Sequence, residues 1–552
     1  MTNFSPNVPP QYLEGLEDTP DEVKAIIRLE PREPESDPTL GIPVSVNRQG
    51  KPAHRLVTIG DSLTQGFQSG AIFNTSLSYP MLIARELGCS GQFRYPKYDS
   101  PGEGLPLNLE KLTKDLGDRF RVADGINAID FAMILPWLRT YLDANEDYWE
   151  GRAKNSFQSP EKGLINHNLA MYGWDLRNTL SRTAKTAQDI ILKNPFKDND
   201  EFNSMRQVPE HANEIATLRV LNTARDKNGV ALTPLGAAKA LSQEGDGIET
   251  LIIAIGSNNA LGSILTFKAV WSESDFYTDM SVNDRYTVWQ PSHFKAELDL
   301  IVEQVKQIKA RHVIWATVPH VTIPPFVKGI NPGKEGKKVS PGSRYYPYYV
   351  PIWLDEEKFD VKRHPHLTAN QARSIDSAID KYNESIVDAV RQGRREGKDW
   401  YVFEMVSVLD RLAYKRYLAE EDRANRPSWW TAYDLPPALD KLNPKPDTRF
   451  FISDAKGRHQ GGLFSLDGIH PTTIGYGIMA QEVIAIMQLA GVEFFNSRGE
   501  RRTSPIKIDF ARLIQEDSLI SKPPTTIAAV LDFAGWLDSM TGFMSQMYKS
   551  NL

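Results

Sequence analysis

A serine, an aspartate and a histidine stand where they can form a nucleophilic site. Ser62 follows a short β-branched run from Arg55 to Gly60, and Asp467 precedes His470 by three residues near the other end of the chain. A serine hydroxyl is a weak nucleophile until a histidine accepts its proton, and that histidine needs a carboxylate to orient it. We therefore expect Ser62 to be the nucleophile, His470 the base and Asp467 the partner of the histidine.

Two further segments carry the hydrogen-bond donors that an acyl transfer needs. Asn258 follows an apolar run over 249–255, so its side-chain amide would emerge at the same edge of a sheet as Ser62. Gly173 ends the segment Asn-Leu-Ala-Met-Tyr-Gly, and a glycine has no Cβ to keep a substrate away from its N–H. We expect the N–H groups of Ser62 and Gly173 and the amide of Asn258 to form the oxyanion hole.

The elements that must position these residues follow from the hydrophobic pattern. Apolar runs of strand length alternate with segments of helical periodicity, and such alternation predicts an α/β fold with a mostly parallel sheet between helices. The strand-like runs cover 55–60, 249–255, 311–318 and 400–408, and the helical segments cover 79–87, 293–309, 369–395 and 472–489. Parallel sheets of this kind bind ligands at the carboxyl ends of their strands, which is where Ser62 and Asn258 fall.

Four blocks of sequence occur in the order that defines the GDSL or SGNH hydrolases. They are Gly60-Asp61-Ser62-Leu63, Asn168-Leu-Ala-Met-Tyr-Gly173, Gly256-Ser-Asn258 and Asp467-Gly-Ile-His470. The chain resembles that family over 54–490. The resemblance implies a flavodoxin-like sheet and a serine esterase or lipase that works through an acyl-enzyme, without cofactor or metal. It also implies Ser62, Asp467 and His470 as the catalytic residues, with Gly173 and Asn258 as oxyanion donors.

The chain departs from the family's pattern in three respects. Asn259 stands where the family usually has aspartate, and 408 residues separate Ser62 from His470, far more than in a compact member. Gly125 and Gly163 lie in the same stretch as Gly173 and are alternatives to it. The motifs of other enzyme classes are missing from the sequence. Residues 60–64 read Gly-Asp-Ser-Leu-Thr and lack the second glycine of the G-x-S-x-G motif of other serine hydrolases, and neither the metalloprotease motif H-E-x-x-H nor a P-loop occurs.

The length beyond one compact hydrolase domain falls into extensions and insertions. Residues 1–53 contain nine prolines and predict an extended N-terminal arm. Within the hydrolase domain at 54–490 we expect insertions near 193–246, 270–291, 324–351 and 410–460. The stretch 491–552 predicts a helical C-terminal extension, whose apolar helix around 527–547 would dock on the body or on a second copy of the chain, giving a homo-oligomer.

Two of the expected insertions contain aromatic residues, and each group of aromatic residues has two possible roles. The tyrosines at 345–349 lie beside several lysines, and they either pack on the body or belong to a lid over the substrate. Trp429 and Trp430 either line a substrate pocket or form the insertion's own small core. His364 and His366 are two histidines without nearby cysteine, so we expect no metal site there.

Composition limits the classes of function. A net charge of −6 over 552 residues disfavours a nucleic-acid binder, and the single Cys89 allows no intramolecular disulfide. No stretch is apolar and long enough to span a membrane. The first residues lack the apolar core of a secretory signal, which favours a cytoplasmic protein, although a processed secreted form would look the same.

The expected function is therefore hydrolysis of a small-molecule or lipid-like ester. The same residues would serve an acyltransferase, in which an alcohol replaces water in the second step. A catalytically silent binding scaffold is the alternative from another class, and the complete set Ser62, Asp467 and His470 argues against it.

Overall fold

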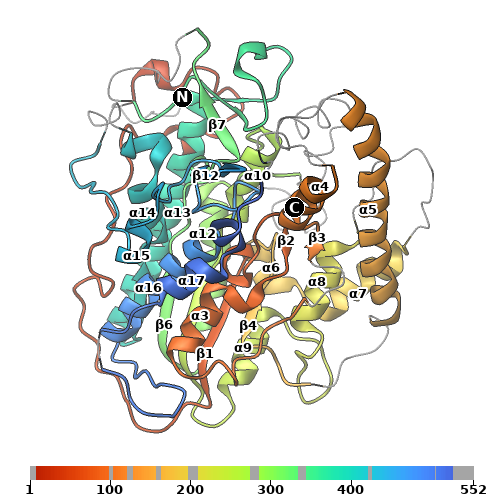
Figure 1. Ribbon diagram of the computed structural model, residues 1–552. Coiled ribbons are helices and arrows are strands. Elements are labelled where there is room, and N and C mark those ends of the chain that lie inside the picture. Colours follow the sequence, from red (N-terminus) through yellow and green to blue (C-terminus); the bar gives the residue numbers. More distant parts are fainter. Residues whose placement is uncertain are drawn as a thin grey trace.

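The computed structural model describes residues 8–98, 104–120, 128–156, 163–196, 209–273, 285–333, 343–419, 426–503, 505–525 and 527. This part of the chain is an α/β structure, in which helices flank a five-stranded parallel sheet (Figure 1). The strands are β1 (His54–Gly60), β4 (Asn168–Ala170), β5 (Ile248–Ala254), β6 (Ala310–Ala316) and β10 (Trp400–Phe403). Their order across the sheet, β4-β1-β5-β6-β10, is compatible with a flavodoxin-like fold.

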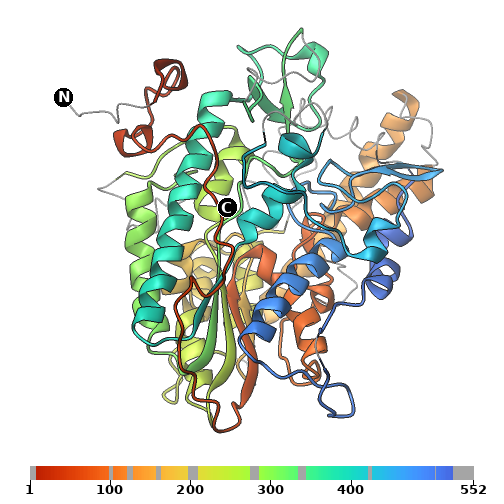
Figure 2. The ribbon, with the colours of Figure 1, turned by 90° about the vertical axis from the view of Figure 1, so that its left-hand side faces the viewer.

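The central strands are buried on both faces, which explains why their sequences are continuous apolar runs. One face of β5 packs Leu251 and Ile253 against α12 (Pro291–Val305) and α13 (Ala369–Arg395). The other face packs Ile252 and Ala254 against α3 (Tyr79–Glu86) and α16 (Thr473–Leu489). Figure 2 shows these two pairs of helices on opposite sides of the sheet. Covering helices on both faces are what a parallel sheet requires.

The expected helices lie close to their predicted positions, and one expected strand is partly wrong. α13 covers 369–395 as predicted, and Thr368 and Gln371 form a capping box at its start. The apolar run over 400–408 is a strand only to Phe403, and α14 (Met405–Leu412) follows directly. An apolar run this short fits a buried strand and a buried helix equally well, and tertiary packing decides between them. The three-residue strand β4 was too short to be predicted.

The N-terminal arm covers β10, one of the two edge strands of the sheet. Its described part, residues 8–53, contains η1 (Pro10–Tyr12) and α1 (Asp21–Lys24) and is otherwise irregular, running along α13 and β10 (Figure 2). The N–H of Val402 in β10 donates to the carbonyl of Pro38 at 3.0 Å, and Arg32 forms an ion pair with Glu404 at 2.6 Å. Covering an edge strand in this way satisfies its backbone and prevents pairing with other chains.

The expected insertions contain small packed elements. The 324–351 region contributes β7 (Val327–Ile330) and β8 (Tyr348–Pro351) to an antiparallel sheet with β9 (Leu367–Thr368), and Tyr345 and Tyr349 are fully buried. These two tyrosines therefore pack into the body. Trp430 is buried in a small cluster with Ile323, Ala413 and Tyr417, and its indole N–H donates to the Asp410 carbonyl at 2.9 Å. Trp430 thus belongs to the core of its own insertion.

The remaining described elements surround the sheet. They are α2 (Ser62–Gln65), β2 (Ala71–Ile72), η2 (Thr75–Leu77), β3 (Leu105–Pro106), α4 (Leu109–Phe120), α5 (Ala128–Ser156), α6 (Leu176–Ser181), α7 (Ala184–Lys193), α8 (Ala212–Leu221), α9 (Pro234–Ser242), α10 (Asn258–Thr266), η3 (Glu356–Lys358), η4 (Tyr414–Leu418), α15 (Pro437–Asp440), β11 (Ile452–Asp454), β12 (Gly457–Gln460), α17 (Phe510–Glu516) and α18 (Ser518–Ser521). None of the described helices combines the length and apolar character needed to cross a membrane. The helix expected around 527–547, and with it the expected homo-oligomer contact, lies outside the described residues except for Ile527.

Candidate active site

The register of the sheet brings the candidate residues to one edge. Gly60, the last residue of β1, pairs with Ala170 in β4 on one side and with Ala254 in β5 on the other. The carboxyl ends of these three neighbouring strands are therefore level. The segments that follow them carry Ser62, Gly173 and Asn258, at the point where the strand order of the sheet reverses. Ligands of open α/β sheets bind at this point.

Ser62, His470 and Asp467 form a continuous hydrogen-bonded chain. The Oγ of Ser62 lies 2.8 Å from Nε2 of His470, and Nδ1 of His470 lies 2.9 Å from Oδ2 of Asp467. The exposed fractions of Ser62 and His470 are 5% and 7%, whereas Asp467 is 1% exposed. The serine and the imidazole thus retain a small opening to solvent, while the carboxylate behind them is buried. This is the arrangement of a nucleophile, its base and the group that orients the base.

The loop before α16 folds around the Asp467 carboxylate. Its Oδ1 accepts the backbone N–H groups of Ile469 and His470, both at 2.8 Å, which turns the chain so that the imidazole points toward β1. The ring of Phe67 packs against the His470 ring at a centroid distance of 4.6 Å. The loop and the aromatic contact together fix the plane of the imidazole.

Electrostatics keeps Asp467 ionised. Burial alone would raise the pKa of Asp467, but the adjacent His470 imidazole and the backbone N–H donors, including that of Gly70, hold the pKa below its usual value. The carboxylate is therefore negative at neutral pH. A negative carboxylate at Nδ1 favours the tautomer whose Nε2 is free to accept the proton of Ser62.

Ser62 is placed by a tight strand-to-helix turn. Asp61 caps α2, because its carboxylate accepts the N–H of Leu63 at 3.0 Å; the cap residue is thus Asp61, and Ser62 is the first residue of the helix. At Gly60 an added Cβ would lie 2.3 Å from Oγ1 of Thr64, so only glycine allows this close approach.

Asp61 is a site residue to which the sequence reasoning gave no role. Asp61 is 1% exposed, and desolvation raises the pKa of its carboxyl to about 6, although the N–H of Leu63 and the nearby Ser257 and His470 lower it. Ser257 precedes Asn258, so Asp61 lies close to the segment after β5. The available signal was its position directly before a helix that begins at a strand end.

Gly173 and Asn258 are connected to each other. The N–H of Trp174 donates to the carbonyl of Met171 at 3.3 Å, and Gly173 occupies the third position of this turn with φ +77°. That position requires a positive φ, which favours glycine. The Asn258 amide donates to the carbonyl of Trp174 at 2.7 Å, and its second N–H remains for a ligand. Both candidate donors thus belong to one hydrogen-bonded unit beside Ser62.

The two alternative glycines differ from Gly173 in position. Gly163 precedes β4, which runs from Asn168 to Ala170, and it therefore lies toward the amino end of that strand. Gly125 lies outside the described residues. Gly173 follows β4 at the carboxyl edge, on the same side of the sheet as Ser62.

If the site performs acyl transfer, replacing Asn258 by alanine is expected to lower kcat on an ester by about 10²–10³-fold, because the developing oxyanion would lose one fixed donor. Steady-state kinetics on a p-nitrophenyl ester measures this loss. Asn370→Ala is the matched control. The Asn370 amide, in α13, also donates to backbone carbonyls, but these belong to Gln11 and Glu14 of the N-terminal arm. A loss below threefold in Asn258→Ala would contradict the role in the oxyanion hole.

Other reactive side chains lie apart from this site. Burial raises the pKa of the Cys89 thiol to about 11, so little thiolate forms at neutral pH. Nδ1 of His364 accepts the N–H of Asp360 at 2.9 Å, and Nδ1 of His366 lies 2.9 Å from the carbonyl of His364. Over the part of the chain that the structure describes, no group of three or more His, Cys, Asp or Glu side chains is arranged to hold a metal ion.

Comparisons with known proteins do not assign the chain to a family. No family model matches the chain, and neither a curated protein nor a solved structure matches it. The function is therefore inferred from the geometry of the site and from the sequence blocks that compose it.

Proposed function

We propose that the protein is a serine ester hydrolase of the SGNH type. The proposal rests on the chain of hydrogen bonds from Ser62 through His470 to Asp467, at 2.8 and 2.9 Å, between segments 408 residues apart in sequence. A histidine bonded to a serine and to a buried carboxylate at once is the arrangement that activates a hydroxyl for attack on an acyl carbon.

In the first step His470 accepts the hydroxyl proton of Ser62 at Nε2 while Oγ forms a bond to the ester carbonyl carbon. The carbonyl oxygen becomes negative and is held by the N–H groups of Ser62 and Gly173 and by the amide of Asn258. His470 then gives its proton to the alcohol oxygen as the carbon–oxygen bond to the alcohol breaks. Asp467 stabilises the imidazolium between these two proton transfers.

In the second step His470 accepts a proton from water, and the resulting hydroxide attacks the acyl carbon of the Ser62 ester. The same donors hold the oxyanion again. When the bond from the acyl carbon to Oγ breaks, His470 returns the proton to Ser62 and the carboxylic acid leaves. The chemistry is complete with the side chains of this site.

An apolar pocket whose wall includes sequence neighbours of Ser62 and His470 favours an apolar acyl group in the substrate. The pocket has a volume of about 100 Å³ and is lined by Leu63, next to the nucleophile, and by Ile469 and Pro471, on either side of His470. Side chains of α14 and α16 form much of the remaining wall, which is completed by Pro319, Pro324, Thr448, Leu463 and Phe464. A cavity of about 150 Å³ accommodates a benzene ring, so this pocket fits a short aliphatic chain.

The test of the proposed function is covalent labelling combined with turnover. We expect a fluorophosphonate probe to modify the wild-type protein at Ser62, identified by peptide mass spectrometry, and to leave Ser62→Ala unmodified. With p-nitrophenyl esters of increasing acyl length, we expect the highest kcat/KM at short chains. Absence of both labelling and hydrolysis in the wild-type protein would refute the proposal that the protein is a serine hydrolase. Labelling of Ser62→Ala would refute the assignment of Ser62 as the nucleophile.

A further inference from the structure

The Asp467 carboxylate has a second layer of support that comes from another part of the chain. The N–H of Gly70 donates to Oδ2 at 2.9 Å, and Oδ2 is the oxygen that faces the His470 imidazole. The hydroxyl of Ser465 lies 3.3 Å from Oδ1 and itself accepts the N–H of Ser69 at 2.7 Å. The Gly70 N–H therefore binds one carboxylate oxygen directly, and the Ser69 N–H holds the Ser465 hydroxyl that lies at the other oxygen.

Ser69 adopts a backbone conformation that needs external support. Its φ is +50°, in the left-handed region that is unfavourable for a residue with a Cβ. Three further hydrogen bonds hold it there. Its Oγ accepts the N–H of Leu466 at 3.2 Å, its carbonyl accepts the N–H of Leu109 at 2.8 Å, and its hydroxyl donates to Oε1 of Glu110 at 2.7 Å.

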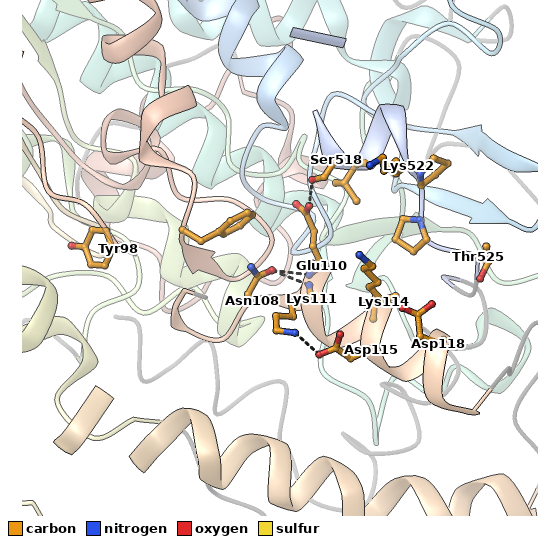
Figure 3. A pocket seen from close by; sticks show the side chains of 16 residues that line it. Tyr98, Asn108, Glu110, Lys111, Lys114, Asp115, Asp118, Ser518, Lys522 and Thr525 are labelled. Atoms are coloured by element: carbon orange, nitrogen blue, oxygen red, sulfur yellow. Dashed lines mark hydrogen bonds and ion pairs between the residues drawn. The ribbon is translucent and has the colours of Figure 1, made fainter. Parts of the chain in front are cut away.

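Glu110 is the charged end of this support. It lies in the first turn of α4, where its other oxygen, Oε2, accepts the hydroxyl of Ser518 (Figure 3). The carboxyl forms part of the wall of a pocket of about 670 Å³. An ionised carboxylate accepts from both hydroxyls at once, whereas a protonated one must use one oxygen as a donor. The hydroxyls of Ser69 and Ser518, one at each oxygen of Glu110, can both donate to the ionised form.

We propose that Glu110 is a positioning residue for the catalytic site, which it supports by fixing Ser69 and thereby the two donors that orient Asp467. This inference rests on the proposed function, in which Asp467 orients the base. The chain of contacts runs from Glu110 to the Ser69 hydroxyl, and from the Ser69 and Gly70 backbone to the carboxylate. When Glu110 is protonated, its hydrogen bond to the Ser69 hydroxyl weakens, and Ser69 and Gly70 are held less firmly against Asp467.

Titration of Glu110 gives the inference a measurable signature. Desolvation, together with the negative charges of Asp517 and Asp467, raises the pKa of Glu110 to about 7, although the two hydroxyl donors lower it. Glu110 is thus ionised above about pH 7 and protonated below it. The charged groups around it are Asp467, Asp517, Lys111, Lys114, Asp115, Asp118 and Lys522.

The experiment compares Glu110→Gln with Asp115→Asn. Glutamine keeps the shape of the side chain but stays neutral at every pH, as the protonated carboxyl is. Asp115 lies on the same helix and pocket wall, is paired with Lys111 at 2.6 Å, and is not hydrogen-bonded to Ser69, so its variant controls for lost negative charge. We expect kcat of the wild type to fall about tenfold as the pH decreases through 7 and Glu110 becomes protonated, in a step that Asp115→Asn also shows.

In Glu110→Gln this extra step is expected to be absent, with kcat already about tenfold low at pH 8 and KM within twofold of the wild type. Asp115→Asn should retain the step. Ser69→Ala should reproduce the loss, and combining it with Glu110→Gln should add little, because both variants interrupt one chain. Wild-type kcat and an unchanged pH profile in Glu110→Gln would overturn the positioning role while leaving the hydrolase intact.

A readout without turnover separates the two proposals. The proton between Nδ1 of His470 and Oδ2 of Asp467 should give a downfield proton resonance, which is identified by its absence in His470→Ala. We expect its chemical shift to change as wild-type protein is titrated through pH 7 and to lose this change in Glu110→Gln but not in Asp115→Asn. An identical titration in all three proteins would overturn the inference even if no ester were hydrolysed.

Discussion

Replacing His470 by alanine is expected to lower kcat for ester hydrolysis by about 10⁶-fold, because the Ser62 hydroxyl then has no base within reach. The imidazole is the only group in the hydrogen-bonded chain that can both accept the serine proton and return it to the leaving alcohol. Single-turnover kinetics on a p-nitrophenyl ester measures the loss in the acylation step. Fluorophosphonate labelling of Ser62 should slow in parallel.

His312→Ala is the matched control for this variant. His312 is also buried, and it lies 2.6 Å from the Asp399 carboxylate, so its removal breaks a similar His–Asp pair. His312 lies near the amino end of β6, however, whereas Ser62 lies at the carboxyl ends of the strands. We expect His312→Ala to lose stability and keep kcat. Retention of a tenth or more of wild-type kcat in His470→Ala would contradict the assignment of the base.

Replacing Asp467 by asparagine is expected to lower kcat by about 10⁴-fold with little change in the fold. The asparagine oxygen still accepts the N–H groups of Ile469 and His470, which hold the loop. Its amide, however, turns an N–H toward Nδ1 and favours the tautomer in which Nε2 of His470 carries the proton. That imidazole is unable to accept the proton of Ser62.

Asp399→Asn controls for this change, because Asp399 is a buried carboxylate that also faces an imidazole, that of His312. Its replacement should leave the pH dependence of kcat unaltered. In Asp467→Asn we expect kcat to recover partly at alkaline pH, where serine deprotonation needs less help from a base. A variant that retains wild-type kcat at pH 7 would show that Asp467 does not orient His470.

The site depends on segments from both ends of the chain. Asp61 and Ser62 directly follow the first strand, β1, whereas Asp467 and His470 lie in the loop before α16. The support for Asp467 comes from Gly70 and, through Ser69, from the helix that begins at Leu109. We therefore expect substitutions in this helix to affect the Asp467 carboxylate through the backbone of Ser69 and Gly70.

The sequence pattern predicted most of the fold that holds the site. Helical spacing gave the bounds of α13 and α16 to within a residue, because long amphipathic helices repeat their signal over many turns. Short elements carry little signal, which explains why β4 was missed and why the run after Phe403 was assigned to a strand.

The positions of Ser62, Asp467 and His470 beside predicted strands and helices, together with four sequence blocks that resemble the GDSL hydrolases, identified these three residues as candidates. Their mutual distances were decided only by the tertiary structure, since a contact between residues 408 apart depends on every element between them. Ser69 and Glu110 were invisible to the sequence argument for the same reason. Their roles depend on a left-handed backbone and on a carboxyl packed between two hydroxyls, and these exist only once the chain has folded.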